Sequence, residues 1–266
     1  MPQELFLSLW RNRTLVWQLT KRDVLGRYRG SVMGLLWSLF NPILMLGVYT
    51  FVFSVVFQAR WGEGTTSKAD FAIILFAGLI VHALFAECIN RSPGLILSNV
   101  NYVKKVVFPL EILPWVAMGS ALFHATISVT VLLAFFVATH GFLNWTAFLL
   151  PFIVFPLIVL TMGLSWFLAS IGVYVRDVAQ VTGILMTVLL FLGPIFYPVS
   201  VLPAEYQTLI HLNPLTFVIE QVRAVLISGR MPMGSGLALY TMVALSIAWI
   251  GFVWFQLTRR GFADVV

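Results

Sequence analysis

Five long uncharged runs, one of them long enough for two helices, dominate the chain and are separated by charged segments. A helix needs about 20 apolar residues to cross a hydrocarbon core of ~30 Å, and each run can reach that length. We therefore predict six membrane-spanning helices, at 34–57, 71–90, 112–139, 145–174, 178–197 and 235–257. Barrel strands would instead show segments of alternating polarity. The fold class that this pattern predicts is an all-α integral membrane protein.

Two of these boundaries rest on turn residues rather than on charges. Residues 112–175 carry no charge and are too long for one helix, and the turn-like sequence at 140–144 divides them into two spans. Pro194 and Pro198 interrupt the fifth predicted span, so we expect its helix to end near Tyr197.

The segment before the first span, residues 1–33, has the pattern of an amphipathic helix. Trp10, Trp17 and Val24 recur at helical spacing, and most of the arginines lie elsewhere on the helical wheel. Such a helix lies in the membrane interface, with its rings at the acyl boundary and its cations near lipid phosphates. We expect an amphipathic interface helix here.

A second polar segment, residues 91–114, is punctuated by three prolines and contains a predicted short helix at 95–107. Apolar residues lie beside polar ones along it. A short helix of this kind can lay its apolar side into a groove of a soluble protein. Composition allows equally an interfacial loop that two lysines hold at the membrane surface.

Residues 198–233, between the last two spans, are unusually apolar for a loop. Asn213-Pro214 divides them into two helical pieces, which are too short to cross a membrane and too apolar to leave it. We expect an external re-entrant or interfacial helical hairpin, in which Glu220 and Arg223 face each other. A short tail, 258–266, follows the last span.

Composition and charge support a membrane protein and orient it. The 266 residues are 60% hydrophobic and 10% charged, against roughly 45–50% and ~25% in soluble domains. The cations that give a net charge of +6 lie between uncharged runs, so an anionic membrane surface is the expected partner and nucleic acid is not. Twelve of the 16 lysines and arginines share one face, and four lie on the other: Arg60, Lys68, Arg223 and Arg230. The positive-inside rule then places both termini in the cytoplasm.

The chain lacks the residues that most enzymatic chemistry needs. Its single cysteine, Cys88, excludes a disulfide framework, a cysteine zinc site and an iron–sulfur cluster. No Gly-x-x-x-x-Gly-Lys-[Ser/Thr] loop is present. We expect no catalytic residue, metal or cofactor in this chain. His82, Glu87 and His124 are the ionisable residues that fall within or beside the spans, and a proton-coupled carrier that uses them is an alternative function.

Five short motifs along the chain are familiar as a set. They are Lys21-Arg22-Asp23 with the 28–37 sequence and Asn41-Pro42, Asn99 with the 104–114 sequence, Arg176-Asp177-Val178, Pro194-Ile195-Phe196-Tyr197-Pro198, and Asn213-Pro214-Leu215 with Arg223. In order and spacing they resemble the polysaccharide exporters of the ABC type-2 permease family, and most closely its Wzm-like O-antigen exporters. Met33 stands where that family usually has leucine. The resemblance runs from about residue 15 to the C-terminus.

The resemblance implies partners and a transport function. Such permeases form a homodimer that joins two copies of a cytoplasmic ABC ATPase, which binds the ATP and Mg. The complexes carry O-antigen, capsule or teichoic-acid chains on a lipid carrier, here an undecaprenyl-diphosphate-linked glycan, across the bacterial inner membrane. A permease for a small amphiphilic drug is an alternative, because its fold would look the same.

Residue chemistry and the resemblance together predict three sets of site residues. Aromatic faces bind successive sugars without charge, and the predicted channel residues are Trp37, Tyr49, Phe53, Phe196 and Tyr197; ordinary packing is the alternative. Arg27 and Arg29 would attract the carrier diphosphate at the entrance. Contact with the ATPase is expected at Asn99, Val103, Lys104, Lys105 and Val107.

Overall fold

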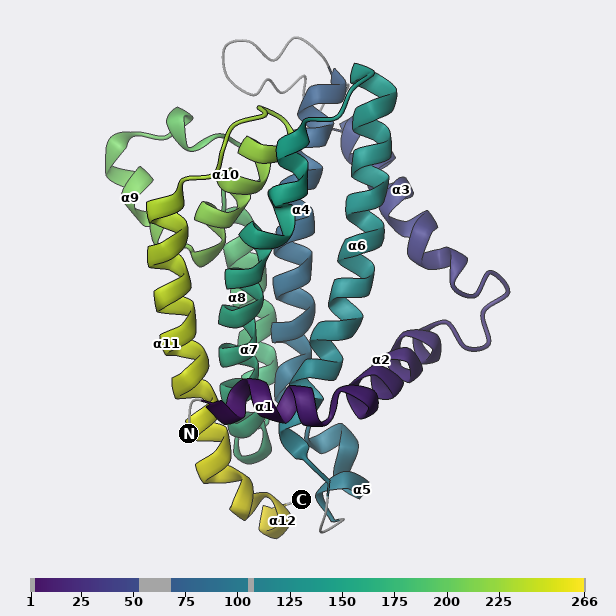
Figure 1. Ribbon diagram of the computed structural model, residues 1–266, viewed down its shortest axis with the longest axis vertical. Coiled ribbons are helices and arrows are strands. Elements are labelled where there is room, and N and C mark those ends of the chain that lie inside the picture. The colour runs from purple at the N-terminus through teal and green to yellow at the C-terminus, as the bar shows by residue number, and fades with distance from the viewer. Residues whose placement is uncertain (1–2, 53–67, 105–107, 266) are drawn as a thin grey trace.

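The computed structural model describes residues 3–52, 68–104 and 108–265, and the regular elements in them are all helical (Figure 1). Four helices are long and apolar enough to cross a membrane: α4 (Lys68–Arg91), α6 (Leu113–His140), α7 (Leu150–Tyr174) and α11 (Gly234–Thr258). Two shorter apolar helices accompany them, α3 (Leu36–Phe51) and α8 (Val178–Phe191). The protein is therefore an all-helical, multi-pass membrane protein. Six complete crossings stay a prediction.

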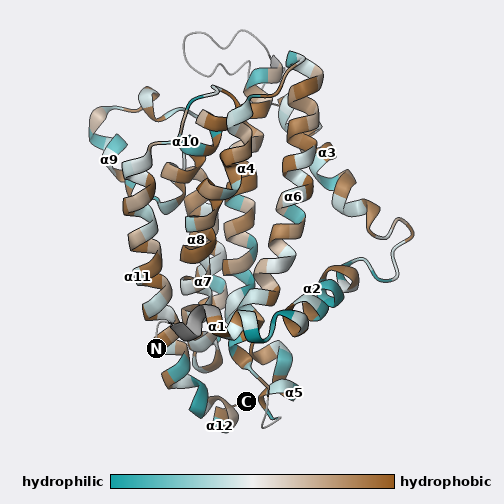
Figure 2. Cartoon of the chain, in the orientation of Figure 1, coloured by the Kyte–Doolittle hydropathy of each residue, from teal (hydrophilic) through white to brown (hydrophobic). Residues whose placement is uncertain are grey.

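The central helix of the bundle is α4. It contacts α3, α6, α7, α8 and also α10 (Pro214–Leu226), and every residue from Phe71 to Ala77 is buried. A helix that is apolar all round is typically enclosed by other helices. Figure 2 shows the apolar residues concentrated along the upright helices. The core of the molecule therefore lies around α4.

Small residues allow α7 and α11 to pack closely together. A Cβ atom on Gly251 would overlap the backbone carbonyl of Gly163, and one on Gly163 would overlap the backbone of Ala248. Between helices in a bilayer, small residues permit close backbone approach and the dispersion contacts that follow. Gly163 and Gly251 therefore have a packing role between these two helices.

The amphipathic segment differs from the single helix that its pattern predicts. It forms α1 (Gln3–Arg11) and α2 (Arg13–Arg27), with Asn12 between them at φ −104° and ψ 17°. The Asn12 amide donates to the carbonyl of Ser8 at 2.9 Å. An asparagine side chain that bonds nearby backbone competes with regular helix geometry, which accounts for the break. Both helices lie across one end of the bundle (Figure 1).

The predicted helix at 95–107 is also not continuous. The chain forms 3₁₀ turns η2 (Ser92–Gly94) and η3 (Leu97–Asn99) and then a single α-turn, α5 (Val100–Val103); residues 105–107 lie outside the described part. Asn99 again bonds backbone, donating to the carbonyl of Leu95 at 2.9 Å. The same competition between side chain and helix applies here.

The helix α8 ends at Phe191, six residues before the predicted end at Tyr197. Gly193 precedes Pro194, and a residue before proline is disfavoured in helical conformation. The carbonyls of Pro194 and Ile195 accept hydrogen bonds from the buried guanidinium of Arg223, which also donates to the carbonyl of Ile74. Arg223 therefore satisfies backbone groups that the early helix end leaves without a helical partner.

The division of residues 198–233 into two helical pieces agrees with the sequence pattern, and their external placement stays a prediction. α9 (Ala204–Leu212) and α10 meet at Asn213-Pro214, and the side chain of Asn213 caps α10 by accepting from the amide of Leu215 at 2.9 Å.

Gly30 and Gly34 adopt positive φ angles of 84° and 52° in the turn between α2 and α3, which glycine does without steric cost. Short turns complete the chain: η4 (Leu110–Ile112), η5 (Trp145–Leu149), η6 (Val199–Val201), η7 (Arg259–Gly261) and α12 (Phe262–Val265).

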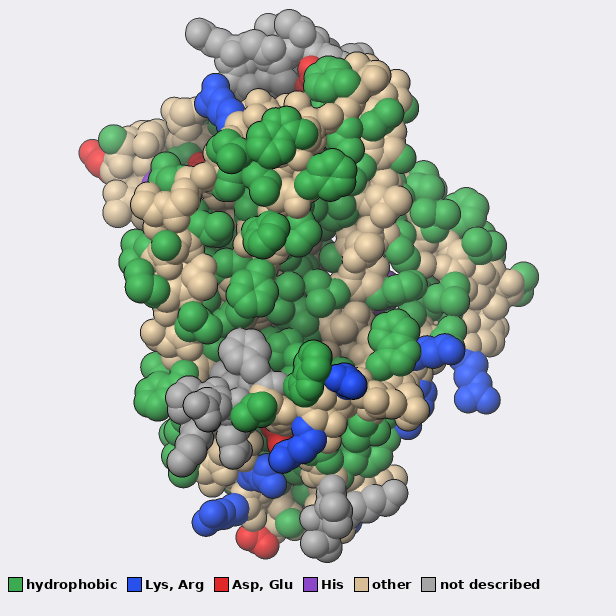
Figure 3. All heavy atoms as spheres, viewed as in Figure 1, with side chains coloured by type: hydrophobic (Ala, Val, Ile, Leu, Met, Phe, Trp, Pro, Cys, Tyr) green, Lys and Arg blue, Asp and Glu red, His purple; other side chains and the backbone are tan. Residues whose placement is uncertain are grey.

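One end of the bundle is strongly basic. It carries α1, α2, α5 and α12, together with the first and last described residues (Figure 1). Figure 3 shows lysine and arginine side chains gathered there, below a wide apolar surface. We call this end the basic end and the end with α9 and α10 the hairpin end.

Candidate functional site

A polar cluster joins α2 to the bundle near the basic end. Arg27 of α2 forms an ion pair with Glu87 of α4, and His124 Nδ1 of α6 lies 3.1 Å from the second Glu87 oxygen. An ionised carboxylate only accepts, so Nδ1 donates its hydrogen to Glu87, and Nε2 lies 3.2 Å from the Tyr28 hydroxyl. Three helices are connected in this way.

A second pair lies beside the first. Arg91 of α4 donates to Asp23 of α2 at 2.8 Å, and the Ser120 hydroxyl of α6 donates to the other Asp23 oxygen at 2.5 Å. Burial alone would raise the Asp23 pKa, but hydrogen bonds from Arg91 and Ser120, with the charges of Arg91 and Arg27, outweigh it and lower the pKa. The carboxylate therefore stays ionised where α2 meets the bundle.

The predicted proton relay is only partly brought together. Glu87 and His124 are hydrogen-bonded, but His82 faces α8, where its Nε2 lies 2.9 Å from the carbonyl of Met186. In the described part of the chain, no hydrogen bonds link His82 to the other two. Arg27 also neutralises Glu87, so the geometry favours a structural joint over a proton path.

The two predicted entrance residues have different surroundings. Arg27 is paired with Glu87, whereas Arg29 lines a shallow groove of about 440 Å³ on the outer side of α2. Lys21, Arg22 and Gln18 line the same groove, and no acidic side chain does. The groove therefore presents positive charge that no lining carboxylate offsets.

The predicted channel aromatics are spread along the molecule. Trp37 is exposed on the first turn of α3. Tyr49 lies near the C-terminal end of the same helix and lines a cavity between helices. Phe196 and Tyr197 follow α8, where the Tyr197 hydroxyl donates to the carbonyl of Phe191 at 2.7 Å. Phe53 lies outside the described residues. Whether these side chains face a common path stays a prediction.

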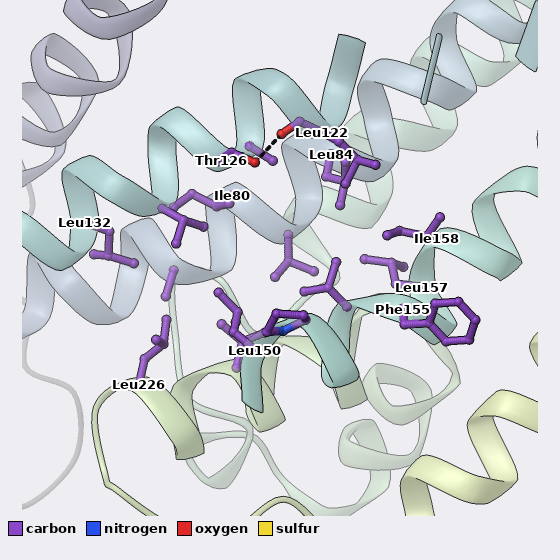
Figure 4. Close-up of a pocket in the computed structure, with 17 residues that line it drawn as sticks. Ile80, Leu84, Leu122, Thr126, Leu132, Leu150, Phe155, Leu157, Ile158 and Leu226 are labelled. Carbon is purple, nitrogen blue, oxygen red and sulfur yellow. Dashed lines mark hydrogen bonds between the residues drawn. The ribbon is translucent and has the colours of Figure 1, made fainter. Parts of the chain in front are cut away.

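A large cavity lies between α4, α6 and α7. Its volume is about 490 Å³, and Ile80, Leu84, Leu150 and Ile158 project toward it (Figure 4). The one hydroxyl in its lining, Thr126 Oγ, donates to the carbonyl of Leu122 at 2.8 Å. Sugar hydroxyl groups would therefore find few partners here, and hydrocarbon suits the lining better.

Those predicted ATPase contacts that the structure describes lie at the basic end. Val103 is half-buried against the bundle, Lys104 is exposed, and the Asn99 amide bonds within its own turn. Lys105 and Val107 lie outside the described residues. Among the described contacts, only Lys104 thus offers a fully exposed charge.

Two connections at this end were not anticipated from the sequence. Arg22 donates to the Tyr102 hydroxyl at 2.8 Å and so ties α2 to the α5 turn. The buried Glu111 accepts from Ser8 of α1 at 3.3 Å and from Arg259 at 3.1 Å. A carboxylate is rarely buried without a cation partner. The sequence signal for this connection was therefore the single acidic residue, Glu111, between Pro109 and the uncharged run that begins at Ile112.

These features define a helical membrane protein with a basic, helix-capped end, and the comparisons identify its class. Residues 14–227 match the ABC-2 type transporter family. The match covers most of the chain, and the protein belongs to this family.

The most similar relatives found include permeases of polysaccharide export. The chain is 27% identical over 261 residues to an O-antigen export system permease protein RfbA of Myxococcus xanthus, covering 97% of this chain and 98% of the relative. An RfbA of Klebsiella pneumoniae is 26% identical, with 93% of each chain covered. The polysialic acid transport protein KpsM of Escherichia coli is 26% identical over 85% of this chain and 87% of its own length.

Proposed function

We propose that this chain is the membrane subunit of an ATP-driven ABC exporter that moves lipid-linked polysaccharide, with O-antigen as the first candidate. The observation that carries the proposal is similarity over nearly the full length to permeases named for O-antigen export, within the ABC-2 type transporter family. Similarity to a polysialic acid transport protein extends the candidates to capsule, and the family resemblance extends them to teichoic acid.

The active unit is a homodimer with two copies of a cytoplasmic ABC ATPase, which supplies ATP hydrolysis. The basic end faces the cytoplasm of a bacterial inner membrane, because positively charged segments are retained on that side. The exposed Lys104 and the α5 turn at this end support it as the ATPase-binding surface. Both ends of the described chain lie there (Figure 1).

The glycan carrier enters beside α2 and the polymer passes along aromatic residues. The basic groove that contains Arg29 supports an entrance for an anionic diphosphate, which charge-assisted hydrogen bonds would hold. Tyr49 lines a cavity that also carries the polar side chains of Asn41, His82 and Ser128, which supports its place on the path with Trp37 and the Phe196-Tyr197 pair. Arg27 serves as the joint between α2 and α4 beside that entrance.

One observation favours a second candidate, a permease for a small amphiphile. The apolar cavity between α4, α6 and α7 has a volume in the range of small-ligand pockets (Figure 4). The two candidates differ in the ligand that should stimulate the ATPase: a lipid-linked glycan for the polysaccharide exporter and a small amphiphile for the alternative.

Co-purification followed by ATPase assays tests both candidates. The permease is expressed with the ABC ATPase encoded beside it and reconstituted in lipid nanodiscs. We expect a stable complex whose ATPase rate rises with lipid-linked glycan extracted from the same cells and not with rhodamine 6G. Stimulation by rhodamine 6G alone would favour the amphiphile permease, and failure to bind any ABC ATPase would contradict the proposed function.

A further inference from the structure

A second cavity, between α3, α4, α6 and α8, differs in chemistry from the apolar one. Its volume is about 300 Å³, and four polar side chains line it: Asn41, Tyr49, His82 and Ser128. Asn41, Met45 and Tyr49 are four residues apart and so form one stripe of α3 that faces the cavity. From Asn41 to Tyr49 the stripe extends about 12 Å along the helix axis.

Two polar groups of this lining, the Asn41 amide and the Nδ1 atom of His82, have no hydrogen-bond partner in the described part of the chain. Asn41 is exposed on the apolar helix α3, and its amide makes no hydrogen bond to any described residue. His82 Nε2 lies 2.9 Å from the carbonyl of Met186, which can only accept, so Nε2 carries the hydrogen. The ring's Nδ1 is then an acceptor without a partner in the described part of the chain. Ser128 donates to the carbonyl of His124 at 2.9 Å and keeps acceptor capacity.

The lining restricts the chemistry of an occupant. The described lining contains no lysine, arginine, aspartate or glutamate, so it offers no opposite charge to a phosphate or a cation. A lipid chain would leave the Asn41 amide and the His82 acceptor unpaired in an apolar environment, which is unfavourable. A hydroxyl-bearing ligand both donates and accepts, and its ring carbons can pack on Tyr49 and Phe76.

We propose that this cavity is a subsite for single neutral sugar units, in which the Asn41 amide and His82 Nδ1 bond their hydroxyl groups. The proposal rests on the proposed function and adds the residues that contact the polymer inside the bilayer. A few neutral hydrogen bonds bind a sugar weakly, as repeated passage of a polymer requires. The apolar cavity between α4, α6 and α7 plays no part in glycan contact.

Photo-crosslinking tests this assignment without relying on transport rates. Benzoylphenylalanine replaces Met45 in cells that make the glycan and express the permease with its ATPase; Leu79, in the same lining, is a second position. The matched control carries benzoylphenylalanine at Ile158 in the apolar cavity. We expect carbohydrate-stained adducts from the positions of Met45 and Leu79 and none from that of Ile158.

Substitution of the polar groups supplies the second measurement. In the Met45 photoprobe protein, Asn41→Leu or His82→Phe should each lower the carbohydrate adduct about fivefold per permease recovered, as expected for a lost neutral hydrogen bond. Unchanged adduct yields in both variants would overturn the proposal. So would adducts to lipid or to a second permease copy in place of carbohydrate while export continues. If the unsubstituted complex exports no glycan, the proposed function fails and this subsite fails with it.

Discussion

At the scale of single residues, charges in contact with the bundle decide how α2 is held. Asp23 accepts hydrogen bonds from Arg91 and Ser120, and each of these donors belongs to a different helix. Thr20 lies on the same side of α2 and approaches Gly119 so closely that a Cβ atom there would overlap it. Hydrogen bonds and close packing therefore act on the same face of α2.

Replacing Asp23→Asn should loosen α2. The change removes the ionised acceptor from a partly buried pair and leaves Arg91 with only the more distant carboxylate of Glu87, 3.9 Å away, at a cost of about 1–3 kcal/mol. Hydrogen–deuterium exchange of the α2 amides should rise correspondingly. Asp264→Asn, at an exposed position on α12, is the matched control and should leave the exchange unchanged.

Acid should have the same effect as the Asp23 substitution. The Asp23 pKa is below its ordinary value of 3.8, so the carboxylate stabilises the docked helix above that value and the contribution is lost as pH falls through the lowered pKa. Exchange of the α2 amides should thus stay low at pH 5 and rise below pH ~4. A rise that is complete by pH 5 would point to another titrating group.

At the scale of elements, α2 and α5 form a connected unit at the basic end. Tyr102 accepts from Arg22 and stacks on Phe108 with ring centroids 4.2 Å apart. Motion of the α5 turn would therefore reach α2 directly, and through Asp23 and Arg27 it would reach α4 and α6. Under the proposed function, this connection would carry nucleotide-driven motion into the bundle.

Binding and coupling should be separable by substitution at this unit. Lys104→Glu reverses an exposed charge and should weaken ATPase binding severalfold, with the difference shrinking at high salt. Tyr102→Phe removes the hydroxyl that Arg22 bonds and should leave ATPase binding intact while lowering glycan-stimulated ATPase activity. Pull-down and ATPase assays measure the two quantities. Full stimulation in Tyr102→Phe would show that α2 and α5 act independently.

Val103→Asp is less informative than the Lys104 change. Val103 packs partly against the bundle's own core, so an aspartate there would disturb the fold as well as any partner contact. The sequence pattern could not separate these two roles, because an apolar residue suits either surface.

At the scale of the whole molecule, the distribution of charge defines two unlike ends. The basic end carries the described cations of α1, α2 and η7, and Lys104, which follows α5 (Figure 3). The hairpin end carries α9 and α10, of which α10 is largely buried and is capped by Asn213. Opposite ends of this kind match a transporter whose energy input and exit lie on different sides of a membrane.

Cysteine labelling should locate the two ends in cells. In a Cys88→Ala background, Glu205→Cys and Arg230→Cys should react with a membrane-impermeant maleimide from outside, and Asp264→Cys should react only after lysis. All three native side chains are exposed, so accessibility does not limit the reaction. External labelling at residue 264 would overturn both the six-span prediction and the cytoplasmic placement of the basic end.

Much of this architecture followed from local sequence. Four of the predicted spans agree closely with helices of the structure: 71–90 with α4, 112–139 with α6, 145–174 with η5 and α7 together, and 235–257 with α11. They could be predicted because a bilayer requires long apolar runs. The division of 198–233 at Asn213-Pro214 is likewise local, since proline cannot continue the preceding helix. The helix breaks at Asn12 and Asn99 could not be predicted in this way, because they depend on side-chain hydrogen bonds to the backbone and the spacing of apolar residues does not reveal these bonds.

Only the tertiary structure decided which residues meet. The sequence grouped Glu87 and His124 with His82 and predicted an entrance role for Arg27, whereas the fold joins Arg27, Glu87 and His124 as one cluster. It also separates His82 from that cluster and places it with Asn41 in a cavity between helices. Such contacts depend on the tilt and rotation of each helix. A helix that is apolar all round does not encode its rotation in hydrophobicity, because lipid and protein interior are equally apolar neighbours.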